Sequence, residues 1–125
     1  MCVICDAKEN YSQLIEEIGL KCSDCQTLKE IPKELINIKG LVCDNCPLLS
    51  IIHISSINLT HLYCDNCPLL QLNSISLLNL TVLHCSNCPI ITEIPSSLLN
   101  LTDLNCSDCP IIIWTFFGFC MFNKF

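Results

Sequence analysis

The sequence predicts a repeat solenoid, a fold in which one small structural unit is copied along the chain and stacked on itself. Five C-x-x-C pairs recur at one constant interval, and a sixth pair ahead of them stands one position out of that register. The pairs are Cys2/Cys5, Cys22/Cys25, Cys43/Cys46, Cys64/Cys67, Cys85/Cys88 and Cys106/Cys109. A unit this short cannot bury a core alone, so the constant period indicates units that stack on one another.

Apolar positions keep the same period as the cysteines. The leucine two positions before each first cysteine is Leu20, Leu41, Leu62, Leu83 or Leu104. Within residues 80–85, Leu83 and Cys85 alternate with their neighbours in the pattern of a short strand with one buried face. Ser86 and Asn87 are turn formers that end this strand. The Ile-Pro and serine residues farther on predict a short irregular or 3₁₀ segment on the outer side.

This pattern resembles the leucine-rich repeat family, whose unit reads L-x-x-L-x-L-x-x-[NC]-x-L. Residues 80–88 match it position by position, with Cys85 in the place of the third leucine and Cys88 in the Asn/Cys place. The resemblance covers roughly residues 20–112 and implies about five 21-residue rungs, with a parallel sheet on the concave side. The doubled cysteine is similar to cysteine-rich repeat proteins of amoeba-infecting giant DNA viruses, which implies a viral protein.

The chain is expected to form a single domain over residues 1–125, in three parts. Residues 1–20 form an N-terminal flank, where the spacing of apolar residues predicts a short amphipathic helix over 8–19. Residues 21–112 hold the repeats. Residues 113–125 form an apolar C-terminal end, too short to span a bilayer as a helix. Self-association is predicted there through Trp114, Phe116, Phe117 and Phe119.

Charge and the start of the chain limit the function. The net charge is −6, arginine is absent, and no lysine occurs between Gly40 and Asn123, so a phosphate backbone would be repelled. Residues 1–20 lack the pattern of a secretory signal, which predicts an intracellular protein rather than a secreted one, in the host cytoplasm if it is viral. The three N-L-T sequons recur at the repeat period and are interpreted as structural.

Three interpretations of the cysteines remain open. They can form reduced, buried thiol ladders whose second members donate S–H groups to nearby carbonyls. They can bind zinc or an iron–sulfur cluster, since two C-x-x-C pairs supply a four-cysteine set. They can also form disulfides, although stacked rungs leave the Cβ atoms wide for a good bridge. The candidate metal ligands are Cys22, Cys25, Cys43, Cys46, Cys64, Cys67, Cys85, Cys88, Cys106 and Cys109.

Two columns of mixed side chains are predicted on the exposed, concave side of the sheet. One column holds Tyr63, His84 and Asn105, and the other holds His61, Val82 and Asp103. Repeat proteins use such surfaces to bind a protein partner, although a plain solvated face has the same composition. No arrangement of nucleophile, base and orienting group recurs, so the sequence predicts a non-enzymatic scaffold without a cofactor. Metal binding is the alternative function.

The residue immediately before each second cysteine is predicted to lie in a turn. These residues are Asp24, Asn45, Asn66, Asn87 and Asp108. Aspartate and asparagine favour turns because their side chains can bond the local backbone.

Overall fold

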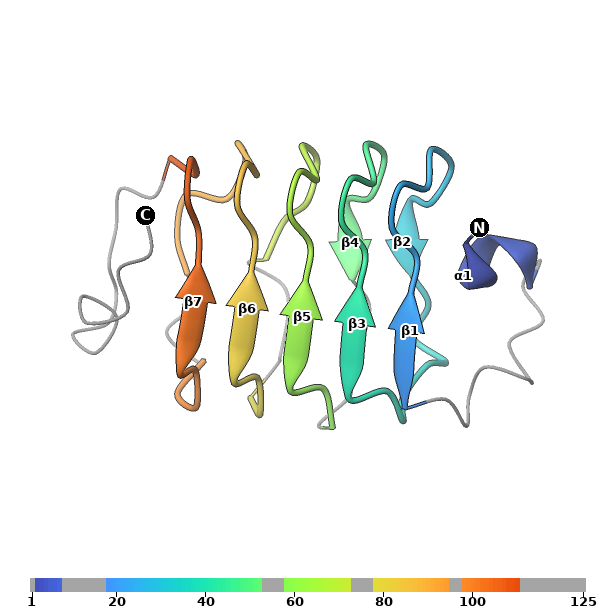
Figure 1. Cartoon of the computed structure of the whole chain (residues 1–125), viewed down its shortest axis with the longest axis horizontal. Helices are drawn as coiled ribbons and strands as arrows, with labels where there is room; N and C mark the ends of the chain where they lie inside the picture. The colour runs from blue at the N-terminus through green and yellow to red at the C-terminus, as the bar shows by residue number, and fades with distance from the viewer. Residues whose placement is uncertain (1, 8–17, 53–57, 73–77, 95–97, 111–125) are drawn as a thin grey trace.

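The computed structural model describes residues 2–7, 18–52, 58–72, 78–94 and 98–110. Five strands form a parallel sheet in the order β1-β3-β5-β6-β7, and they lie side by side along the molecule (Figure 1). Their bounds are β1 Gly19–Lys21, β3 Gly40–Val42, β5 His61–Tyr63, β6 Val82–His84 and β7 Asp103–Asn105. A parallel β-solenoid is therefore the architecture, as the sequence predicts.

The register of the sheet follows the sequence period. Each strand pairs in parallel with the residues one repeat later, so that Leu41 lies between Leu20 and Leu62. The same register continues through Leu83 to Leu104. Because equivalent residues of successive rungs are direct neighbours, each repeat position becomes a column that runs the length of the solenoid.

The core is made of such columns. The middle residue of each strand points inward, and Leu41, Leu62 and Leu83 have no exposed surface. The cysteine that follows each strand is also buried, as the alternation of side chains along a strand requires. Strands this short bury enough apolar surface only because neighbouring rungs cover one another.

A left-handed turn follows each strand. The residue before each second cysteine has a φ near +60°, at Asp24, Asn45, Asn66, Asn87 and Asp108. Asparagine and aspartate tolerate this backbone region better than other residues with a side chain, which confirms them as turn residues. The bonds of their side chains, however, join neighbouring rungs: the Asn66 amide donates to Asn45 at 2.8 Å, and the Asn87 amide donates to Asn66 at 3.0 Å.

The outer side contains a second sheet, which the sequence did not predict. Strand β2 (Glu30–Ile31) pairs in parallel with β4 (Ile51–Ile52), and both lie behind β1 and β3 in Figure 1. No 3₁₀ helix occurs among the described residues of this side. Pro32 helps to explain the difference, because the residue before a proline is driven toward an extended backbone, here at Ile31.

The N-terminal flank carries helix α1 (Val3–Asp6), which lies at the end of the solenoid beyond β1 (Figure 1). This helix precedes the predicted helix over 8–19, most of which falls outside the described residues; Gly19 itself opens β1. The apolar C-terminal end and its predicted self-association also lie outside them. Among the described residues, no helix has the length and apolar character needed to cross a membrane.

Candidate functional site

The predicted partner-binding residues come together on one side of the five-stranded sheet. We define this sheet face by the two outward residues of each strand. In one column Tyr63 lies between Val42 and His84, and Asn105 follows. In the other, Val82 lies between His61 and Asp103. Strand pairing thus makes the residues of each predicted column direct neighbours, while their role in binding a partner stays a prediction.

Side chains on the sheet face also contact one another. The rings of Tyr63 and His84 meet edge to face, with centroids 4.9 Å apart and an interplanar angle of 74°. The Nε2 atom of His84 lies 3.4 Å from a carboxylate oxygen of Asp103. These contacts orient the imidazole between a ring and a carboxylate, but they bring no activated nucleophile to it.

The N-L-T sequons contribute to the backbone ladder at the edge of this sheet. The hydroxyl of Thr81 donates to the carbonyl of Thr60 at 3.1 Å, and the hydroxyl of Thr102 donates to the carbonyl of Thr81 at 3.2 Å. The Asn100 amide donates to the carbonyl of Leu78 at 2.9 Å. These bonds support the structural interpretation of the sequons.

Behind the sheet face, the middle rungs carry an interior thiol ladder of six buried cysteines. They are Cys43, Cys46, Cys64, Cys67, Cys85 and Cys88, none of which has exposed surface. The second thiol of each pair donates to the carbonyl of the first cysteine one rung back. The Cys46 thiol reaches the Cys22 carbonyl at 3.1 Å, and the Cys67 thiol reaches the Cys43 carbonyl at 3.2 Å. This confirms the predicted S–H donation to carbonyls.

Burial keeps the interior thiols protonated. Desolvation raises the pKa of Cys67 to about 11, against an ordinary value of 9.0, although the backbone N–H of Cys46 opposes the shift. Desolvation also raises the pKa values of Cys43 and Cys64 well above that value. Neutral thiols in this setting behave as small apolar side chains with one weak donor.

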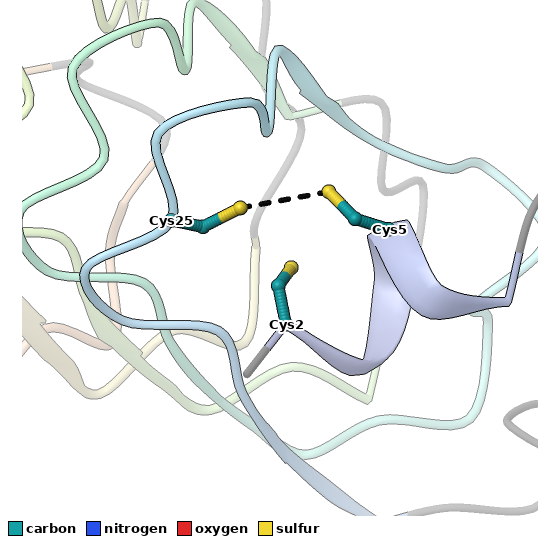
Figure 2. A group of neighbouring side chains, drawn as sticks. All are labelled: Cys2, Cys5 and Cys25. Atoms are coloured by element: carbon teal, nitrogen blue, oxygen red, sulfur yellow. Dashed lines mark hydrogen bonds between the residues drawn. The ribbon is translucent and has the colours of Figure 1, made fainter.

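The N-terminal end of the solenoid is built differently. Cys2 is the N-cap of helix α1 and Cys5 lies within it, and their sulfur atoms meet the sulfur of Cys25 from the first rung. All three sulfurs lie within 4.8 Å of one another, and those of Cys5 and Cys25 are 3.6 Å apart. Figure 2 shows these two sulfurs directed at each other, with the Cys2 sulfur directed at the gap between them. We call Cys2, Cys5 and Cys25 the N-terminal thiol cluster.

Polar neighbours surround this cluster. The Thr27 hydroxyl donates to the Cys5 sulfur at 3.6 Å and lies 3.5 Å from the Cys25 sulfur. Burial disfavours ionisation of Cys25, but bonds from the Thr27 hydroxyl and backbone and from the Cys5 and Cys2 thiols outweigh it and lower the Cys25 pKa to about 7. Burial raises the pKa of Cys5 to about 11 and that of Cys2 to about 12.

The buried thiol of Cys22 adjoins the cluster. It is hydrogen-bonded to the thiol of Cys2, and the backbone N–H of Ile4 donates to its sulfur. Both cysteines of the first rung therefore face the two cysteines of α1, so that two C-x-x-C segments meet at this end.

The metal ligands predicted from the sequence are thus only partly brought together. Of the ten repeat cysteines, Cys25 alone belongs to a described group of three or more ligand atoms with mutual distances under 4.8 Å. At the other end, the Cys109 thiol contacts those of Cys85 and Cys88, which lower its pKa, but the three do not form such a group. Cys2 and Cys5 were not among the predicted ligands. The available signal was their position, which is shifted by one from the register of the other pairs.

A pocket of about 290 Å³ lies on the outer side, and none of the described cysteines lines it. It is lined by Gln71, Leu72, Ile90, Ile91, Thr92 and Glu93. Glu93 is the one titratable side chain of that lining, so the pocket offers no combination of acid, base and nucleophile.

Comparison with known proteins agrees with the architecture. A family model described as Leucine Rich Repeat matches residues 79–101, a segment that contains β6 and the turn after it. No curated protein and no solved structure matches the chain. The columns of leucine, the parallel sheet and this match over residues 79–101 support a resemblance to the leucine-rich repeat family, and the parallel β-solenoid is consistent with a solenoid of such repeats.

Proposed function

We propose that the chain is a non-enzymatic scaffold that binds a protein partner on its sheet face. The observation that carries this proposal is the pair of outward columns on a continuous five-stranded sheet. Leucine-rich repeat folds are commonly protein-interaction scaffolds, and extended sheet surfaces of repeat proteins are their usual binding surfaces.

Tyr63 and His84 are the proposed anchor of this surface. Their edge-to-face packing restricts both rings before a partner arrives, which lowers the entropic cost of binding. Both side chains remain partly exposed, so each offers ring surface as well as a polar group at its tip. Tyrosine is enriched among the residues that dominate binding energy in protein interfaces.

Charge defines the kind of partner. Asp103 lies beside His84 on the sheet face, and the sequence from Gly40 to Asn123 contains no lysine or arginine. A neutral or basic protein segment is therefore complementary, whereas an acidic one would be repelled. We further propose an intracellular setting, the host cytoplasm of a virus-infected cell, where the thiols stay reduced.

Site-specific photocrosslinking tests this proposal. A photoreactive phenylalanine analogue replaces Tyr63 on the sheet face or, as the matched control, Lys33 in the exposed turn of the outer side. In cells, the analogue at position 63 should give discrete adducts, and the same adducts should weaken at least about tenfold when His84→Glu is added to the sheet face.

Two results would contradict the proposal. One is a set of identical adducts from positions 33 and 63, which would indicate non-specific contact. The other is adducts from position 63 that survive the change at His84 unaltered, because a partner seated on the two rings must sense that charge.

A further inference from the structure

The N-terminal thiol cluster has a composition and geometry that the interior thiol ladder lacks. It joins sulfurs from two separate C-x-x-C segments, one on α1 and one on the first rung. In the interior, each second thiol already donates to a carbonyl of the preceding rung. The bonds described for Cys25 instead go to another thiol and to a hydroxyl.

We propose that this end of the solenoid is a structural zinc site, with Cys2, Cys5 and Cys25 as thiolate ligands and Cys22 as the fourth. Zinc in structural sites is four-coordinate and tetrahedral, and two C-x-x-C segments from different parts of a chain are a common source of its ligands. The proposal goes beyond the protein-binding role and does not depend on it.

The distances fit this ion. A tetrahedron with Zn–S bonds of about 2.3 Å has sulfurs about 3.8 Å apart. The sulfurs of Cys5 and Cys25 are 3.6 Å apart, and Cys2 lies within 4.8 Å of both. Cys22 is in hydrogen-bond contact with Cys2. Three ligands are thus already close to tetrahedral spacing, and the Cys22 side chain, which lies outside that group of three, would have to turn toward the ion to complete the set.

The surroundings also suit a thiolate site. Backbone N–H groups of Cys5, Ile4 and Thr27 donate to the sulfurs of Cys2, Cys22 and Cys25. The Thr27 hydroxyl adds a donor to Cys5. Donors of this kind orient metal ligands and stabilise their negative charge. Binding releases the thiol protons as the zinc–sulfur bonds form, so the proton balance closes without an oxidant.

The site would close the end of the solenoid. The first rung has a neighbouring strand on one side only, since β1 pairs with β3 alone in the described sheet. Helix α1 covers the other side of this rung, but it has only four residues and cannot hold its position by helix propensity. A zinc ion bound by both α1 and the first rung would fix the helix there, because the helix could leave the rung only if zinc–sulfur bonds broke.

Metal analysis of the full chain tests the proposal. The protein is refolded anaerobically with zinc, passed over a desalting column and assayed for metal and free thiols. About one zinc per chain is expected in the wild type. Cys5→Ser and Cys25→Ser should each retain less than about a tenth of that amount, because each removes one ligand.

Cys109→Ser is the matched control. Cys109 is the second cysteine of the last described rung and is partly buried, like Cys25, but it lies at the opposite end of the sheet. This variant should keep the zinc content of the wild type. Far-ultraviolet circular dichroism of every variant checks that the solenoid is folded, and cobalt substitution provides a second measurement. The wild type should show the intense visible absorption of tetrahedral cobalt thiolate, and Cys5→Ser should not.

Two outcomes would overturn the inference. One is a wild type without zinc after refolding with the metal. The other is zinc content that falls in Cys109→Ser but not in Cys5→Ser. Tyr63 and His84 are not among the proposed ligands and lie on other rungs, so this test and the crosslinking test fail independently.

Discussion

The first rung and the middle rungs of this solenoid contain the same C-x-x-C motif in different environments. In the middle rungs, the preceding rung presents a carbonyl to each second thiol, and Cys46 and Cys67 donate to it. At the N-terminal end, helix α1 takes the place of a preceding rung and presents the thiols of Cys2 and Cys5 to Cys25. The motif therefore packs the core in the middle rungs, and it forms part of a cluster of thiols at the N-terminal end.

This difference shows that neighbouring structure decides the chemistry of a repeated motif. A buried thiol with a carbonyl acceptor is satisfied as a neutral group, and it would lose that bond if it bound a metal. A thiol that faces other thiols has no such bond to lose. Ligand spacing in the sequence is equal in both regions, so spacing alone cannot distinguish them.

The largest expected effect is the loss of stability when a core leucine is shortened to alanine, and this loss should differ between the two regions. Leu62→Ala should lower the free energy of unfolding by about 2–5 kcal/mol, because it opens a cavity between two covering rungs. Leu62 has no exposed surface, whereas Leu20 retains 8% and has a paired strand on one side only. Leu20→Ala should therefore cost less, and urea denaturation of both variants measures the difference. Equal losses would contradict the idea that the end rung is held less tightly.

The sequence predicted the repeated part of this fold well. The constant period alone placed Leu41, Leu62 and Leu83 in one buried column and Tyr63 beside His84 on the sheet face. Both results follow from strand alternation and parallel stacking, which a periodic sequence specifies locally.

Features that depend on a break in the repeat could not be predicted in the same way. The cluster of Cys2, Cys5 and Cys25 depends on how α1 docks against the first rung, and no periodic position encodes that contact. The outer pairing of β2 with β4 likewise rests on two-residue strands, too short for a periodic signal.

Alkaline pH should weaken the middle rungs. The pKa of Cys67 is about 11 in the folded protein, above the ordinary value of 9.0, so folding favours its neutral form. Stability from this thiol is complete below pH 9 and is lost between pH 9 and 11, at about 1 kcal/mol per pH unit. Urea denaturation from pH 8 to 11 should show a slope at least this steep, because the raised pKa values of Cys43 and Cys64 act in the same direction, and Cys67→Ala should reduce it. An unchanged slope in the variant would contradict the assignment to Cys67.

A third comparison substitutes the second cysteine of each region. In metal-free, reduced protein, Cys67→Ala should cost about 1–3 kcal/mol, because it leaves a small cavity and removes the donor to the Cys43 carbonyl. Cys25→Ala should cost less than about 1 kcal/mol there, since Cys25 is partly exposed and bonds no buried carbonyl in the described contacts. Adding zinc should then stabilise the wild type but not Cys25→Ala, so the difference between their free energies of unfolding should grow. If both substitutions cost the same without metal, the proposed contrast between the regions is wrong.

The smallest effect concerns the left-handed turns that all rungs share. Asn66 has a φ of 57° and lies in the middle of the asparagine ladder, bonded to both Asn45 and Asn87. Asn66→Ala should cost about 1–2 kcal/mol, because alanine resists this backbone region. Asn66→Gly should cost only a few tenths, because glycine adopts the turn freely and loses only exposed side-chain bonds. If the glycine variant were as unstable as the alanine variant in urea, the bonds between rungs, and not the backbone conformation, would be what selects asparagine. The turns would then contribute to stability through stacking, as the leucines do, and the end rung with its single ladder neighbour at Asp24 would again be the weaker region.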